Sequence, residues 1–326
     1  WGIMTNSERW ESWIPEATIS FQTEAYLSTK FPRVDGDHTI EVNAAIVPNE
    51  IVAAAVTMLE ENQILQSEGT WIARRGTASE VVQLLGEHPI ELKNRWDLFE
   101  RNDEVLVADY FLLTGGLESE PLSATNLVIG DPDLIYLEEG AVVEGATLNT
   151  TGGPIYIGQD AEVMEGSLIR GPFALCEHAG VKMGAKIYGA TTIGPYCKVG
   201  GEISNCVFQA YSNKGHDGFL GNSVVGEWCN FGADSNTSNL KNNYSLIRSW
   251  SYEKGAEVET GLQFMGVFMG DHSKCAINTM FNTATVVGVS CNIFGGGFPK
   301  KFIPSFTWGG VESSTAFELD KAKEAA

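Results

Sequence analysis

The sequence predicts a left-handed parallel β-helix of hexapeptide repeats, preceded by an α/β domain. The first observation is an apolar residue at every sixth position in the middle of the chain. The second is a small residue at the fifth position of most blocks. A period of six excludes one face of an α-helix, and turn signals spaced for hairpins are missing. Short fixed periods indicate stacked coils, here with three sides of six residues. The apolar residues that open the blocks are Ile157, Val163, Ile169, Leu175, Val181, Ile187, Ile193 and Val199.

The repeat extends in both directions from this run, with interruptions. It begins weakly at Leu137 and Val143 and is interrupted by a turn-forming insertion at residues 149–154. After Val199 the phase is predicted to slip by two residues. It then resumes at Val207, Asn213, Phe219, Val225 and Phe231. Residues 237–262, rich in Asn and Ser, predict an excursion from the coil, a kind of segment that serves binding or subunit contact. Sixfold spacing returns from Met269 onward.

The first part of the chain lacks this period and predicts a mixed α/β domain. Helices are expected at residues 51–62 and 78–85 and around residues 96–103, with strands at 39–47 and 105–113. We place the domains at residues 1–128, 129–300 and 301–326, the last a polar tail that is helical or frayed. No Gly-rich phosphate loop is found in the first domain. Because the sequence begins with Trp1 rather than Met, we expect this domain to be N-terminally incomplete or degenerate.

Composition narrows the functional classes. Forty-two acidic residues against 21 basic ones give a net charge of −21, which repels nucleic acids and anionic membranes. A phosphate-bearing ligand therefore needs a locally basic site. No apolar run has the length of a transmembrane helix, and no signal peptide is visible. The six cysteines contain no CxxC pair, so we expect reduced core residues in a cytoplasmic protein.

Three of the five histidines occupy the fourth place of a repeat block, on the outer wall near a corner: His178, His216 and His272. His178 and His216 are 38 residues apart, which predicts one shared face and a separation of roughly 10 Å. The close histidine pair of a zinc site is missing, so no metal is predicted. His216 lies between Gly215 and Gly218, which let a substrate approach the backbone. Its imidazole has the basicity to deprotonate an attacking amine, although a plain surface histidine is the alternative.

Several motifs around His216 carry a family resemblance. They are residues 213–216 (NKGH), 219–227 (FLGNSVVGE), 229–233 (CNFGA), 236–240 (NTSNL) and 266–272 (GVFMGDH). With them, residues 130–310 resemble the acetyltransferase half of the bifunctional glucosamine-1-phosphate N-acetyltransferase/N-acetylglucosamine-1-phosphate uridylyltransferases. The whole chain resembles a divergent bacterial branch of that family.

The resemblance implies a set of roles. His216 would act as general base toward an amino-sugar phosphate, with Asn230 and Asn239 holding the sugar and Ala233 contacting acetyl-CoA through its backbone. Lys300 and Lys301 are candidates for the cofactor's phosphates. A homotrimer with the cofactor between chains is expected. The alternatives are an inward ladder residue for Asn230, a turn residue for Asn239 and solvated surface for the two lysines.

Departures from the family pattern leave the substrate open. Ser204 stands where the family has a phosphate-binding lysine, and the candidates to replace it are Lys182, Lys186, Lys198 and Lys214. Asn43 stands where a magnesium-binding Asp would be, so Mg²⁺ is expected only if the first domain is an active nucleotidyltransferase. The alternative functions are a sugar-1-phosphate nucleotidylyltransferase whose β-helix mainly forms the oligomer, and a non-enzymatic scaffold.

Overall fold

The structure, a computed structural model, describes residues 1–34, 36, 38–77 and 79–325. The chain forms two compact units. Unit 1 contains residues 1–3 together with 96–326, and unit 2 contains residues 4–95. This division differs from the predicted boundary at residue 128, because the segment from Trp96 onward packs on the β-helix. The β-helix also continues past the predicted boundary at residue 300, since three further strands extend its sheets.

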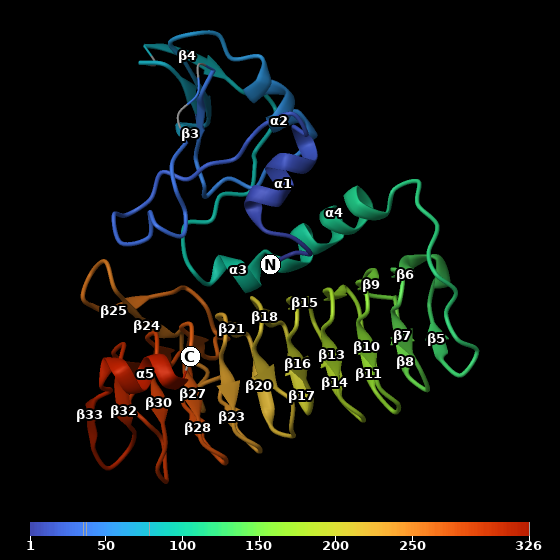
Figure 1. The fold of residues 1–326 in the computed structure, drawn as a ribbon, viewed down its shortest axis with the longest axis vertical. Coiled ribbons are helices and arrows are strands. Elements are labelled where there is room, and N and C mark those ends of the chain that lie inside the picture. Colours follow the sequence, from blue (N-terminus) through green and yellow to red (C-terminus); the bar gives the residue numbers. More distant parts are fainter. Residues whose placement is uncertain (35, 37, 78, 326) are drawn as a thin grey trace. The chain divides into compact units, whose positions relative to one another are not determined.

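Unit 1 is a parallel β-helix, so the predicted left-handed hexapeptide fold is confirmed (Figure 1). Most coils contribute one short strand to each of three faces. Face 1 contains β6 (Ile135–Leu137), β9 (Ile155–Ile157), β12 (Phe173–Leu175), β15 (Thr191–Ile193), β18 (Val207–Phe208), β21 (Val224–Val225), β26 (Phe268–Met269), β29 (Val286–Val287) and β31 (Phe302–Ile303). Face 2 contains β7 (Val142–Val143), β10 (Glu162–Val163), β13 (Gly180–Val181), β16 (Lys198–Val199), β19 (Asn213–Lys214), β22 (Asn230–Phe231), β27 (Lys274–Cys275), β30 (Asn292–Ile293), β32 (Thr307–Gly309) and the antiparallel β33 (Ser314–Ala316). Face 3 contains β5 (Leu127–Ile129), β8 (Thr147–Asn149), β11 (Leu168–Arg170), β14 (Lys186–Tyr188), β17 (Glu202–Ser204) and β20 (Phe219–Gly221), followed by the pair β23 (Asn236–Thr237) and β28 (Met280–Phe281).

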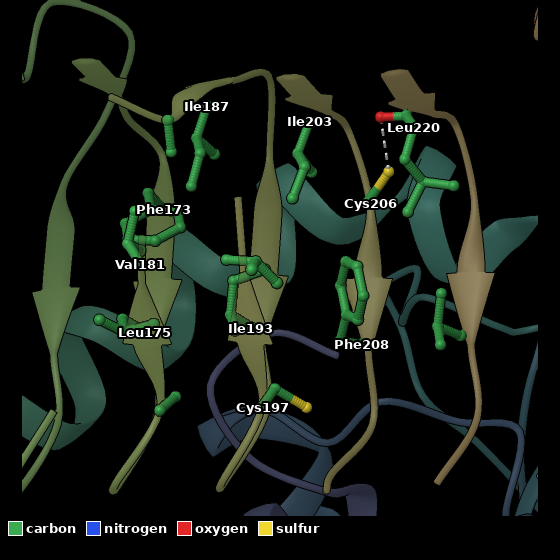
Figure 2. Close-up of a cluster of buried hydrophobic side chains, with 14 of the residues drawn as sticks. Phe173, Leu175, Val181, Ile187, Ile193, Cys197, Ile203, Cys206, Phe208 and Leu220 are labelled. Atoms are coloured by element: carbon green, nitrogen blue, oxygen red, sulfur yellow. Dashed lines mark hydrogen bonds between the residues drawn. The ribbon is translucent and has the colours of Figure 1, made fainter. Parts of the chain in front are cut away.

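The core is the stack of inward side chains that the sixfold period predicts. All eight block-opening aliphatics from Ile157 to Val199 are at most 2% exposed and belong to one cluster. Figure 2 shows part of this stack, in which inward side chains of successive coils lie next to one another in the interior of the β-helix. The small residues at the fifth position are buried as well, for example Ala161 and Cys197. Burial of this apolar column stabilises each coil against its neighbours, at about 25 cal/mol per Å².

The predicted phase after Val199 is wrong by one residue over one coil. The inward residues are Ile203, Phe208, Lys214 and Leu220, and not Val207, Asn213 and Phe219. Two shorter turns, from 199 to 203 and from 203 to 208, produce the shift. Val207 is nevertheless completely buried, because its outward side is covered by other parts of unit 1. The sequence does not distinguish burial inside the β-helix from burial of an outward side chain under a covering segment.

Face 1 is the covered face of the β-helix. Helix α3 (Asp97–Glu100) places Phe99 in a cluster with outward residues such as Val207 and Phe268. Helix α4 (Asn102–Thr114) places Leu106 and Tyr110 against the outer side of face 1. Here the prediction of a strand at residues 105–113 is wrong. The buried residues of this segment recur with helical spacing, and packing against a sheet selects the helix over the β-propensity of its valine and aromatic residues.

The excursion predicted at residues 237–262 is confirmed as a break between β23 and β26. It contains an antiparallel hairpin of β24 (Arg248–Ser251) and β25 (Ala256–Glu259). Trp250 of this hairpin stacks on Phe302, with ring centroids 4.1 Å apart. Residues 149–154 form the predicted turn between β8 and β9. At the end of the chain, helix α5 (Leu319–Ala325) follows β33.

Unit 2 combines helices and a small sheet, as predicted. Its elements are α1 (Asn6–Trp13), β1 (Ile40–Val42), α2 (Glu50–Thr57), β2 (Gln63–Ser67), β3 (Thr70–Arg75) and β4 (Glu80–Gln83). The sheet order is β1-β3-β2-β4. The helix predicted at 51–62 is confirmed in its first part, with Asn49 as N-cap. The helix predicted at 78–85 is wrong, since this segment supplies β4, which pairs in parallel with β2; its residue 78 lies outside the described residues.

All six cysteines are free and buried, as predicted. None of the helices among the described residues combines the length and the apolar character that crossing a bilayer requires.

Candidate functional site

The candidate site is the corner between faces 2 and 3, in the coil that joins β19 to β20. His216 lies in this turn and is exposed. Within the described residues, its imidazole has no hydrogen bond, ion pair or ring contact. The turn is two residues longer than the corresponding turn of the preceding coil, since Lys214 and Leu220 are six apart whereas Val199 and Ile203 are four apart. His216 and Asp217 therefore extend over the shorter turn before them.

Glycines make this longer turn fit. A Cβ on Gly200 would lie 2.6 Å from the carbonyl oxygen of Gly215, and one on Gly201 would lie 2.9 Å from that of His216. Gly218, at φ +113°, has the carbonyl oxygen of Ser235 2.2 Å from where its Cβ would be. Any side chain at these three positions would force the backbone of the turn away from its neighbours.

Lys214, which the sequence analysis proposes as a substrate-binding residue, is 1% exposed and points into the β-helix. Its Nζ donates to the carbonyl oxygens of Gly200 (3.3 Å) and Asp217 (3.0 Å), and to that of His216. Burial lowers the pKa of this amine to about 8, while the nearby Asp217 carboxylate opposes the shift. The sequence placed Asn213 inward and thereby missed the inward direction of Lys214.

Asn230 and Ala233 lie close to this corner, one coil after His216. Asn230 is exposed on the outer side of β22, where it is paired in register with Asn213 of β19 and, through it, with Lys198 of β16. It is thus not the inward ladder residue considered as the alternative. Ala233 belongs to the turn above His216, where the amide of Asp234 donates to the carbonyl of Asp217 (3.1 Å). Lys198 is exposed on the same face as Asn230, two strands away.

Asn239 lies at a different corner, the one between faces 3 and 1. Its Nδ2 donates to Oδ1 of Asn222 (2.8 Å). Asn222 donates in turn to Asn205 (3.0 Å), when the amide of Asn205 is oriented with its oxygen toward Asn222. These three asparagines form a ladder across successive coils, with Asn205 and Asn222 at positive φ. Within one chain, Asn239 and Asn230 therefore do not share a site.

Lys300 and Lys301 also lie away from His216. They precede β31 of face 1, and the amide of Val286 donates to the carbonyl of Lys301 (2.6 Å). Lys300 is exposed, whereas partial burial lowers the pKa of Lys301. Among the described residues, Lys182, in the turn after β13, and Lys198 lie near the His216 corner, and Lys274 is paired with Asn230.

The predicted shared face of His178 and His216 is wrong. His178 lies in the turn from face 1 to face 2, whereas His216 lies in the turn from face 2 to face 3. His178 belongs to an aromatic column along its corner, in which successive ring centroids are 4.7, 5.1, 4.4 and 6.3 Å apart. The sequence analysis missed this column, although aromatic residues at the fourth place of successive blocks could have revealed it. The column consists of His178, Tyr196, Tyr211, Trp228 and His272.

Within the described residues, no three His, Cys, Asp or Glu side chains gather as a metal site. In unit 2, both amide atoms of Asn43 are engaged by the backbone: Oδ1 accepts from Ala45 (3.1 Å) and Nδ2 donates to the carbonyl of Trp71 (3.0 Å). Asn43 thus stabilises a turn, and this local arrangement does not fit a Mg²⁺ ligand.

Comparisons with known proteins give matches in sequence and in structure. Residues 1–118 match the model of the sugar nucleotidyl transferase family. The chain is 26% identical over 146 residues to the bifunctional sugar-1-phosphate nucleotidylyltransferase/acetyltransferase of Sulfurisphaera tokodaii, covering 44% of this chain and 36% of that protein. It is 29% identical over 90 residues to the bifunctional protein GlmU of Methanocaldococcus jannaschii, covering 28% of this chain and 21% of that one. The UDP-N-acetylglucosamine acyltransferase of Campylobacter jejuni aligns with 58% of this chain and 81% of its own, at 18% identity and a TM-score of 0.27.

The chain thus spans about a fifth and about a third of the length of these two curated relatives, both of which are archaeal. A bacterial branch stays an expectation. The resemblance inferred from the motifs is supported: the chain is similar to the bifunctional sugar-1-phosphate nucleotidylyltransferase/acetyltransferases.

Proposed function

We propose that this protein is an acyltransferase that moves an acetyl group from acetyl-CoA to the amine of an amino-sugar phosphate. The observation that carries the proposal is the exposed, unpartnered imidazole of His216 on a glycine-lined corner, with Asn230 and Ala233 one coil above it. The motifs that connect these residues resemble the acetyltransferase half of the bifunctional family. Glucosamine 1-phosphate is the substrate that the resemblance favours.

In the proposed reaction, the neutral imidazole of His216 accepts a proton from the amine as its nitrogen attacks the thioester carbon. Backbone N–H groups at the corner stabilise the oxyanion of the tetrahedral intermediate. The C–S bond then breaks, and the leaving thiolate takes the proton from the imidazolium of His216. The products are the N-acetyl sugar and the free thiol of CoA. Asn230 orients the sugar on face 2, and Lys182 and Lys198 supply positive charge for phosphates in a chain of net charge −21.

A homotrimer would complete this site. Within one chain, Asn239 lies at the corner between faces 3 and 1, so it reaches a substrate at His216 only from a second copy. Faces 2 and 3 remain available for such contacts, because the layer that contains α3 and α4 covers face 1. Light scattering should give three times the chain mass, and a monomer would contradict a site shared between copies. The free, buried cysteines support the cytoplasmic location predicted from the sequence.

The direct test measures thiol release from acetyl-CoA with a panel of amino-sugar phosphates. His216→Ala should lower kcat by about 10²-fold or more, because the general base is lost. His178→Asn is the matched control, since His178 is another exposed histidine of a β-helix corner at positive φ, which Asn tolerates. An unchanged rate in His216→Ala would remove this residue from the mechanism.

The match of residues 1–118 to sugar nucleotidyl transferases favours a second candidate activity. Pyrophosphate release from a nucleoside triphosphate and a hexose 1-phosphate, measured with and without Mg²⁺, tests it. Because the backbone engages both amide atoms of Asn43, this residue is not assigned a Mg²⁺ ion in the proposed activity. A protein that shows neither activity would be a scaffold.

A further inference from the structure

Lys214 is a lysine inside the apolar core of the β-helix. The equivalent positions of face 2 in the neighbouring coils hold apolar residues, such as Val199 before it and Phe231 after it. Lysine is almost never fully buried unless its charge is compensated. Its position therefore requires a local explanation.

The explanation is the longer turn around His216. This turn and the shorter one before it direct carbonyl oxygens toward the inside of the corner. Nζ of Lys214 reaches three of them, those of Gly200, His216 and Asp217. An ammonium group has three N–H donors, so donors and acceptors match in number. Two of the three acceptors belong to the turn that carries the candidate base.

We propose that Lys214 is a positioning residue for His216. Its ammonium holds the backbone of residues 215–218 from the inside of the β-helix. This fixes the direction in which the imidazole of His216 points. The inference rests on the proposed role of His216 as general base. It assigns to Lys214 no contact with the substrate, in contrast to the role proposed from the sequence alone.

The test begins with hydrogen exchange, which is independent of activity. Lys214→Met keeps an unbranched side chain but removes the three donors. The amides of residues 215–218 should then exchange at least about tenfold faster, because the turn opens locally. Ile293→Ala is the matched control, since Ile293 occupies the same inward column in a later coil, and it should leave exchange at 215–218 unchanged. If Lys214→Met does not fold, Lys214→Gln, which retains two donors, replaces it.

Turnover then separates positioning from stability. Measured well below the melting temperature, Lys214→Met should lower kcat about tenfold and change the KM for acetyl-CoA less than twofold. Ile293→Ala should not lower kcat. In a His216→Ala background, Lys214→Met should have no further effect, because the group that it positions is gone.

Each outcome decides one point. Unchanged amide hydrogen exchange at residues 215–218 in a folded Lys214 variant overturns the proposal that Lys214 holds this turn. Faster exchange with unchanged kcat, while His216→Ala remains impaired, overturns the positioning role. Undiminished turnover of His216→Ala overturns the proposed base, and the exchange data still decide whether Lys214 holds the turn.

Discussion

Two corners of the same β-helix have similar backbone turns but differ in the side chains that they carry. Along the corner between faces 1 and 2, residues at positive φ carry large rings, and each ring stacks on the next. Along the corner between faces 2 and 3, the turns near His216 are built from glycines and small residues. The first corner uses its side chains to stabilise the stack. The second leaves the imidazole of His216 exposed and without a stacking partner among the described residues.

The difference lies in what surrounds the histidine at each corner. In the aromatic column, the ring faces are occupied by neighbouring rings, so His178 stacks on Tyr196 and lies 3.7 Å from an oxygen of Asp160. At the other corner, the turn of residues 215–218 begins and ends with a glycine, and the imidazole of His216 has no such partner among the described residues. The turns that carry His178 and His216 both span six residues between inward positions, so glycine content and the shorter turn before His216 distinguish the two corners.

The largest effect is expected when the glycine corner is given a side chain. Gly218→Ala should lower the free energy of unfolding by about 3 kcal/mol or more, since its Cβ would meet the carbonyl of Ser235 at a strained φ. Gly184→Ala is the control at the same corner, with φ +69° but nothing within 4 Å, and should cost about 1 kcal/mol. Urea denaturation measures both. Equal losses would mean that the close packing of the turn is unimportant.

The aromatic corner should affect stability but not turnover. Trp228→Ala removes a ring that stacks on Tyr211 at 4.4 Å and on His272 at 6.3 Å, and we expect a loss of about 2 kcal/mol. Tyr244→Ala, at an exposed aromatic residue of positive φ outside the column, should cost less than about 0.5 kcal/mol. Thiol release should stay within twofold of the wild-type rate in Trp228→Ala. A strong loss of turnover without unfolding would place the site at the aromatic corner instead.

A smaller effect on stability is expected at the corner between faces 3 and 1. Asn222→Ala removes the amide that links Asn239 to Asn205, and should lower the free energy of unfolding by about 1 kcal/mol. Thermal melting of this variant beside Asn282→Ala, in the turn after β28 and outside the ladder, measures it. If the two variants melt together, the ladder does not stabilise the corner.

The last expected effect is a pH dependence of stability that Lys214 produces. Burial lowers its pKa to about 8, below the 10.5 of an unperturbed lysine. Between these values the unfolded chain binds a proton that the folded chain does not, so the free energy of unfolding rises with pH. Below pH 8 both states are protonated and the contribution is constant. The free energy of unfolding of the wild type minus that of Lys214→Met should therefore increase from pH 8 to 10, and a constant difference would mean that Lys214 keeps an ordinary pKa.

Part of the site could be predicted from sequence. The repeat pattern predicts that His216 lies on an outer corner, and the structure shows it exposed in the turn between faces 2 and 3. The family resemblance groups Asn239 with His216, and the charge of Lys300 and Lys301 makes them candidates for the cofactor's phosphates. The β-helix carries all three to another corner. Sequence order does not tell which of three faces a residue occupies once the turns differ in length.

The sequence by itself determined the β-helix, because an inward aliphatic at every sixth position can be buried only by stacking coils. Only the tertiary structure decided that Lys214 points inward and that residues 105–113 form a helix. Both depend on what lies across the packing interface: carbonyl oxygens of a neighbouring turn in one case, the outer side of face 1 in the other. Local propensity carries no information about such distant partners.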